Sequence, residues 1–181
     1  MALHHDYAPN LTDIAKINIL TDPKRLPHTD NPYPISGLGA KFSIQYVVAR
    51  ALIDGAVRLG DFENAAYDDR DARDLMTKIS ACVHPDMDDP NMDTYAAEVK
   101  IIMNDGRELS HRSGDDVLRG PDRPMEKAAL FAKFADCAQR RLPAEAPHPL
   151  YEMLLQLETL PRLSSVTDYL AAIDPSGTKA A

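Results

Sequence analysis

His28 is the side chain of this sequence best placed for acid–base chemistry. It lies in the stretch 23–34, with Lys24 and Arg25 upstream, and four prolines restrict the backbone there. A stiff loop holds a ring at a fixed geometry and has little entropy left to lose. A histidine titrates near neutral pH and can donate or accept a proton. We therefore predict His28 as a candidate catalytic residue; the alternative is a surface histidine in an ordinary proline-rich turn.

Two cations outside this stretch can meet an anion. Lys41 opens an apolar helix beside Gly39, and the first amides of a helix attract negative charge. Arg119 precedes Gly120 and a proline-flanked loop, where its guanidinium can contact a carboxylate. The alternatives are a Lys41 stem that packs on apolar surface with its ammonium in water, and an Arg119 that merely ends a strand.

The sequence carries no complete catalytic constellation of a familiar type. No GxSxG segment surrounds Ser43, and no glycine-rich phosphate loop follows a strand. No pair of Cys or His has the spacing of zinc ligands, so we predict neither a metal nor a cofactor. Cys82 and Cys137 are far apart and lack a CxxC spacing, so we expect two reduced, packed thiols.

The composition is that of a globular, acidic protein. The 181 residues are 44% hydrophobic and 27% charged, and the formal net charge is −8. An acidic chain is a poor ligand for nucleic acid, which needs clustered Lys and Arg. We find no apolar run of about 18 residues that would span a membrane. Residues 1–10 lack the order of a signal peptide, so a cytoplasmic location is expected.

The hydrophobic periodicity predicts an α+β fold. Strands are expected where apolar and polar residues alternate, and helices where apolar residues recur every three to four positions. Asp105-Gly106 predicts a tight hairpin turn, because glycine tolerates positive φ. The expected architecture is an antiparallel sheet of about four strands covered by helices. Strands are predicted at 11–20, 79–83, 95–103 and 108–113, and helices at 37–53, at 69–77 and three times after Pro124.

The expected domain organisation is simple. We predict a flexible N-terminus at 1–10, a single α+β domain over 11–173 and a flexible tail at 174–181. The helix at 37–53 is apolar around most of its circumference, which is typical of a buried helix. The sheet and the other helices are therefore expected to pack around it.

Four stretches together resemble the MmgE/PrpD family, over about residues 10–163. The most specific is the run from Gly39 to Gly55, which contains Lys-Phe-Ser-Ile-Gln-Tyr. The resemblance implies the smaller, α+β C-terminal domain of that family, which acts as a lid over a larger helical domain. The other three stretches are Glu98-Val99 running to Asp105-Gly106-Arg107, then Arg119-Gly120-Pro121, and then Lys133-Phe134.

The resemblance also implies a chemistry. The family contains 2-methylcitrate dehydratases, cis-aconitate decarboxylases and iminodisuccinate epimerases, which remove a proton beside a carboxylate of a small di- or tricarboxylate without a redox cofactor. It implies that the loop carrying His28 faces the substrate cleft, with Lys24, Arg25 and Lys41 as carboxylate contacts. The helical domain, which carries most of the family's active-site residues, has no counterpart in this sequence.

Three functional expectations follow from the resemblance. The first is the lid half of a dehydratase or decarboxylase, inactive without a helical domain. The second is a non-catalytic domain that dimerises or binds a partner through an apolar surface. The third is an epimerase or isomerase, since racemisation needs the same proton abstraction. The expected partners are a small di- or tricarboxylate and either a helical domain or a second copy of the chain, with no nucleic acid and no membrane.

Overall fold

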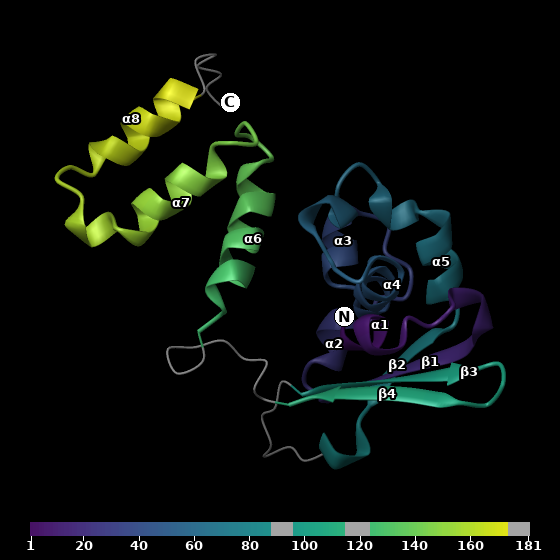
Figure 1. Cartoon of the computed structure of the whole chain (residues 1–181). Helices are drawn as coiled ribbons and strands as arrows, with labels where there is room; N and C mark the ends of the chain where they lie inside the picture. Colours follow the sequence, from purple (N-terminus) through teal and green to yellow (C-terminus); the bar gives the residue numbers. More distant parts are fainter. Residues whose placement is uncertain (88–95, 115–123, 174–181) are drawn as a thin grey trace. The chain divides into compact units, whose positions relative to one another are not determined.

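Residues 1–87, 96–114 and 124–173 are described in a computed structural model of the chain (Figure 1). The chain forms two compact units, Met1–Arg123 and Pro124–Ala181, where we expected one domain over 11–173. The first unit contains a sheet and its covering helices, and the second is helical. The predicted flexible tail at 174–181 and the candidate Arg119 lie outside the described residues.

A four-stranded sheet forms the base of the first unit. Its central strand β1 has Ile17 and Ile19 fully buried on one face, as their alternation with polar residues predicts. Figure 1 shows α1, α4 and α5 over one face of the sheet. The strands are β1 (Ile14–Thr21), β2 (Ile79–Val83), β3 (Ala97–Met103) and β4 (Glu108–Ser113), in the order β2-β1-β3-β4.

The predicted α+β class is confirmed. The sheet is mixed, however, so the predicted antiparallel pairing is wrong for one pair of strands. β1 and β2 are parallel, with Ile17 opposite Ile79, and the other pairs are antiparallel. The long helical connection between β1 and β2 returns the chain to the end of the sheet where β1 began. Such a crossover produces a parallel pair, whereas a short turn produces an antiparallel one.

The β3–β4 hairpin is confirmed. Gly106 has a φ of 86°, in the left-handed region that favours glycine. Asp105 Oδ1 accepts the Arg107 backbone N–H at 3.0 Å, and this bond holds the pKa of the Asp105 carboxyl below its ordinary value. The turn residues thus fix the register of the two strands.

The predicted helix at 37–53 is two helices. Ser43 has extended backbone angles, and its hydroxyl accepts the Tyr46 N–H at 3.1 Å as the cap of a new helix. The same hydroxyl donates to Asn31 O at 2.6 Å, so the break also fastens the proline-rich loop. Phe42, just before the break, is 56% exposed and not buried as predicted. The helices of this unit are α1 (Ala2–Tyr7), α2 (Leu26–Thr29), α3 (Gly37–Lys41), α4 (Ile44–Asp54) and α5 (Arg70–Met76).

Helix α4 lies at the centre of the core. Tyr46 is fully buried, and its hydroxyl donates to the Asp61 carbonyl in the short helix η2 (Leu59–Phe62). Burial is the main cause that raises the pKa of the Tyr46 phenol. The Arg50 side chain is only 16% exposed and lies within 3.6 Å of three carboxylates. They belong to Asp54, Asp61 and Asp69.

The N-terminal residues fold against this core. We expected a flexible end at 1–10, and the structure has α1 there instead. Leu3 is 5% exposed, and His4 Nδ1 lies 2.8 Å from Leu52 O of α4. The buried Leu3 side chain and the long-range His4 hydrogen bond hold this segment on the core. Its polar composition had not predicted a helix.

The second unit consists of α6 (Lys127–Ala138), α7 (Pro147–Leu155) and α8 (Ser164–Ile173). Phe131 and Phe134 of α6 pack on Tyr151 of α7, with ring centroids 5.2 and 5.3 Å apart. Among the described residues, no helix has the length and apolar character needed to cross a bilayer.

Both cysteines are free, but neither is packed. Cys82 lies on the outward face of the edge strand β2, and Cys137 lies near the end of α6; both are exposed. The expectation of buried thiols is therefore wrong. Alternation along β2 places Cys82 on the opposite face from the buried Ile79.

Candidate functional site

The candidate site lies at the end of the sheet where β1 and β2 finish and β3 starts. Thr21 pairs with Val83 on one side and with Ala97 on the other. Because β1 and β2 are parallel, the residues that follow them, Asp22 and His84, leave the sheet at the same end. Helix α2 begins a few residues after β1 and packs against β2.

Asp22 shapes the segment that carries the predicted residues. It is fully buried, and its Oδ1 accepts the Lys24 backbone N–H at 2.7 Å. Its carbonyl accepts the N–H groups of Arg25 and Leu26 at 3.0 and 3.2 Å. An aspartate that binds the amide two residues on is a common turn-forming device, and Pro27 follows near the start of the helix. These contacts turn the chain sharply from β1 into α2.

The far end of α2 is fastened to α4. The Gln45 side chain is 1% exposed and donates through Nε2 to Asp30 Oδ1 at 2.6 Å. The Ser43 hydroxyl holds Asn31 in the same way. The predicted stiffness of this loop therefore has a second cause, because buried side chains of α4 fix its end as firmly as the prolines restrict its middle.

The structure brings three of the predicted residues onto this one segment. Lys24 and His28 are exposed, and Arg25 is half-buried at the cap of α2. Within the described residues, no hydrogen bond or ion pair reaches the His28 ring. The ring is therefore open to solvent, on a segment held in place by buried Asp22 and Gln45.

Lys41 is separate from this group. It is the last residue of α3 and does not open the apolar helix, so the expected helix N-terminus beside it is wrong. Its ammonium lies 5.9 Å from the centre of the Phe62 ring, a cation–π contact. No described contact joins its side chain to α2.

Sequence reasoning missed a buried pair at the same edge of the sheet. His84 is 4% exposed, and its Nε2 lies 3.0 Å from Glu98 Oε2. Its Nδ1 accepts the Asp86 N–H at 3.0 Å, so the hydrogen bonds assign the ring proton of the neutral imidazole to Nε2. His84 is thus bonded on both nitrogens. The only sequence signal was its position directly after an alternating strand.

The charges around this pair are balanced. Lys100 Nζ lies 3.5 Å from the second oxygen of Glu98, and Arg112 Nη1 lies 3.1 Å from Asp86 Oδ2. The buried pair therefore supports this end of the sheet, next to the segment that carries Lys24, Arg25 and His28. Cations such as Lys24 and Arg25 can bind a carboxylate, and the His28 ring can exchange a proton with a ligand.

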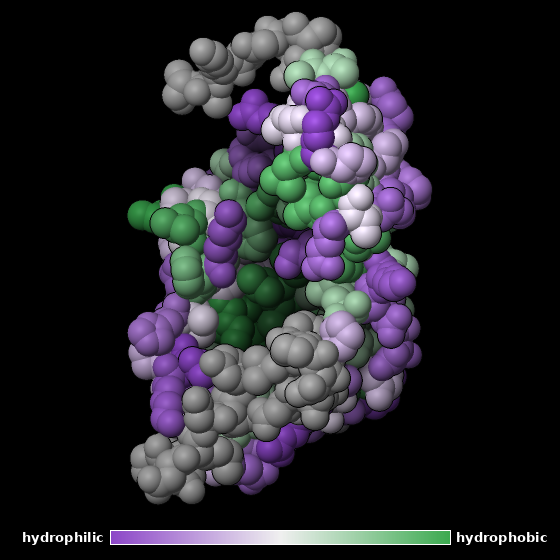
Figure 2. All heavy atoms as spheres, turned by 90° about the vertical axis from the view of Figure 1, so that its left-hand side faces the viewer, coloured by the Kyte–Doolittle hydropathy of each residue, from purple (hydrophilic) through white to green (hydrophobic). Residues whose placement is uncertain are grey.

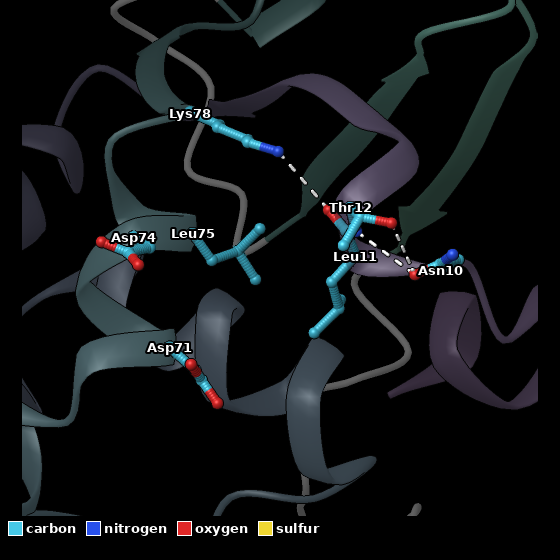
Figure 3. Close-up of a pocket in the computed structure, with 7 residues that line it drawn as sticks. All are labelled: Asn10, Leu11, Thr12, Asp71, Asp74, Leu75 and Lys78. Carbon is cyan, nitrogen blue, oxygen red and sulfur yellow. Dashed lines mark hydrogen bonds between the residues drawn. The ribbon is translucent and has the colours of Figure 1, made fainter.

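The cavity shown in Figure 3 does not fit such a ligand. It has a volume of about 440 Å³ and lies between η1 (Leu11–Asp13) and α5. Asp71 and Asp74 line one wall, and the ammonium of Lys78 is engaged by the carbonyls of Leu11 and Ile14. Two carboxylates repel a di- or tricarboxylate, and none of the predicted site residues lines this cavity. No group of three or more metal-binding side chains occurs among the described residues.

The match to one family covers both the sheet and its crossover helices. Residues 1–158 match the MmgE/PrpD C-terminal domain, so the chain belongs to the MmgE/PrpD family. The predicted resemblance is confirmed, and with it the α+β class.

The chain is also similar to two curated proteins. Cis-aconitate decarboxylase from Mus musculus is 29% identical over 144 residues, which are 79% of this chain and 29% of the relative. Cis-aconitate decarboxylase from Homo sapiens is 27% identical over 165 residues, which are 91% of this chain and 34% of the relative. The chain therefore spans about a third of the length of these relatives.

Proposed function

We propose that this chain forms the lid of a lyase that acts on small di- or tricarboxylates. The match of residues 1–158 to the C-terminal domain of the family carries the proposal. The names of the two relatives support a decarboxylase, and a dehydratase is the alternative that the family resemblance implies. The lid contributes part of a cleft, and a helical domain outside these residues contributes the rest. The isolated chain is therefore inactive.

The proposed reaction begins when a base supplied by the helical domain accepts a proton from the carbon next to a carboxylate of the substrate. Charge then develops on that carboxylate, and nearby cations stabilise it more strongly than they stabilise the starting substrate. Lys24 and Arg25, which directly precede α2, hold carboxylates of the substrate together with Lys41 and Arg119. His28 orients the substrate or returns a proton. Closure of the lid excludes water and strengthens these electrostatic contacts.

The first test measures turnover. The purified chain is incubated with cis-aconitate, and release of CO2 and loss of substrate are followed. We expect no turnover above the uncatalysed rate. Robust activity of the chain alone would refute the idea that the site is completed by another domain.

The second test measures binding. Chemical-shift changes of the chain on titration with cis-aconitate should centre on α2, and His28→Ala and Lys24→Ala should each reduce them. The control is His148→Ala, because His148 is an exposed histidine of the second unit. Unchanged binding in the α2 variants, or equal loss in the control, contradicts the assignment. Deuterium incorporation without CO2 release, seen only with a helical family domain added, would favour an epimerase.

A further inference from the structure

Gln45 is a polar side chain in the buried part of α4. Hydrophilic side chains cover much of the face shown in Figure 2, where water solvates them, whereas Gln45 is 1% exposed. Within the described parts of the chain, its Oε1 accepts no hydrogen bond. A buried acceptor without a donor lowers the stability of a fold, and an apolar side chain would not carry this cost. The contact that the amide does make therefore has to account for its presence.

That contact reaches the segment that carries His28. Gln45 Nε2 donates to Asp30 Oδ1 at 2.6 Å, and Asp30 is the residue that ends α2. Asp30 is exposed and lies two positions after His28. The bond therefore connects the buried helix α4 to the exposed end of α2.

Helix α2 is too short to keep its conformation without such connections. It has four residues, and the amides of His28 and Asp30 donate to Arg25 O and Leu26 O at 3.1 and 2.9 Å. Isolated helices shorter than about 12–15 residues are only marginally stable in water. The direction of the exposed His28 ring therefore depends on the residues that hold the two ends of the segment.

The residues that hold the two ends differ in reach. Asp22 fixes the start of the segment through local bonds to backbone amides within four positions. At the other end, the Ser43 hydroxyl bonds Asn31 O but also caps α4, so α4 itself needs it. The Gln45 amide bonds Asp30 and makes no second bond that the described residues show. Its removal therefore releases the end of α2 and leaves the cap of α4 in place.

We propose that Gln45 is a positioning residue of the candidate site. Through Asp30 it holds α2 in the orientation in which His28 meets a carboxylate substrate. The role towards substrate rests on the proposed function, whereas the hold on α2 is a property of this chain alone. The bond does not require the charge of Asp30, because an amide oxygen accepts it equally. Without the bond, α2 samples other orientations, and a ligand has to order the segment again when it binds.

Hydrogen exchange of the His28 and Asp30 amides, followed by NMR, measures how often α2 opens. Gln45→Met removes the donor and keeps an apolar side chain of similar length, so the protection factors of both amides should fall at least about tenfold. Asp30→Ala removes the acceptor and should have the same effect. The double variant should lose no more than either single variant, because the two residues share one bond. Asp30→Asn keeps an acceptor and should stay within about threefold of the wild type.

Two controls separate a local effect on α2 from a general loss of stability. The Ile17 amide donates to Lys78 O at 2.9 Å in the central strand, and its protection should not fall in any variant. Asp168→Ala, which changes an exposed aspartate of the second unit, should leave the protection of α2 unchanged. If Gln45→Met fails to fold, the exposed position Asp30 still carries the test. Equal losses at Ile17 and His28, unprotected α2 amides in the wild type, or equal exchange in Asp30→Asn and Asp30→Ala overturn the proposal.

Titration with cis-aconitate gives a readout that a purely structural bond would not change. From the chemical shifts of α2, the dissociation constant should rise at least about fivefold from wild type to Gln45→Met. It should rise equally from Asp30→Asn to Asp30→Ala, a pair in which both variants remove the same charge. Equal affinities within each pair overturn the positioning role. A wild type that protects α2 and binds no cis-aconitate instead refutes the proposed function, while the exchange data still decide whether Gln45 holds α2.

Discussion

Gly37 offers a sharp test of how α3 is seated. A Cβ added at Gly37 would lie 2.1 Å from the Phe62 carbonyl oxygen, whereas real Cβ contacts are at least 3.0 Å. Either α3 or η2 must therefore move by 0.9 Å, the difference between the two distances. The obstacle is backbone, so no side-chain rotation relieves it.

We expect Gly37→Ala to lower the free energy of unfolding by about 1–3 kcal/mol, the usual cost of overpacking a filled site. For a chain of this size that corresponds to a fall in Tm of roughly 4–8 °C at the middle of the range. Urea unfolding, followed by circular dichroism, measures the change, and the m-value shows whether the denatured state has also changed.

Gly39→Ala is the matched control on the same helix. Its added Cβ would meet the Ser36 Oγ at 3.2 Å, a side-chain atom that can shift slightly. Alanine gains about 0.5–1 kcal/mol over glycine inside a helix, so this variant should stay within about 0.5 kcal/mol of the wild type. Equal stabilities of Gly37→Ala and Gly39→Ala would refute the close packing of α3 on η2.

Three further predictions concern polar groups of the first unit. Burial raises the pKa of Tyr46, so the stabilising contribution of the neutral phenol is complete below pH 10 and decreases above it. Between pH 9.5 and 11, the free energy of unfolding measured in urea should therefore fall more steeply for the wild type than for Tyr46→Phe. Arg50→Met removes the cation shared by three carboxylates and should cost about 1–3 kcal/mol, whereas Arg70→Met, with a side chain 92% exposed, should cost under about 0.5 kcal/mol. Glu98→Ala leaves the buried His84 N–H without its acceptor and should cost about 1–3 kcal/mol in urea unfolding; Glu98→Gln keeps an acceptor and should recover most of that loss.

Local patterns predicted most of the elements. The alternation at Ile17 and Ile19 identified β1, and Asp105-Gly106 identified the hairpin, because both signals act over a few residues. The break at Ser43 was missed, because apolar residues continue on both sides of it and hid the local cap; the bond from Ser43 to Asn31 is long-range and could not be read from the sequence. The parallel pairing of β2 depends on where a long crossover returns, which no local pattern encodes.

The residues of the candidate site also fall into a group that is near in sequence and a pair that is far apart. Lys24, Arg25 and His28 are near in sequence, so the order of residues alone placed them together. His84 directly follows β2 and Glu98 lies in β3, on the other side of β1, so their contact depends on the register of three strands. Buried long-range pairs of this kind become visible only once the sheet is known.

The position of β1 in the sheet has a consequence for synthesis of the chain. β1 is the first strand to be made, yet its partner residue Ile79 follows Ile17 by 62 positions. At about 5–20 residues per second, the ribosome needs roughly 3–12 s to supply that partner. During this interval the backbone N–H and C=O groups along β1 have no partner strand, so the nascent polypeptide presents an unpaired strand edge to a holding chaperone.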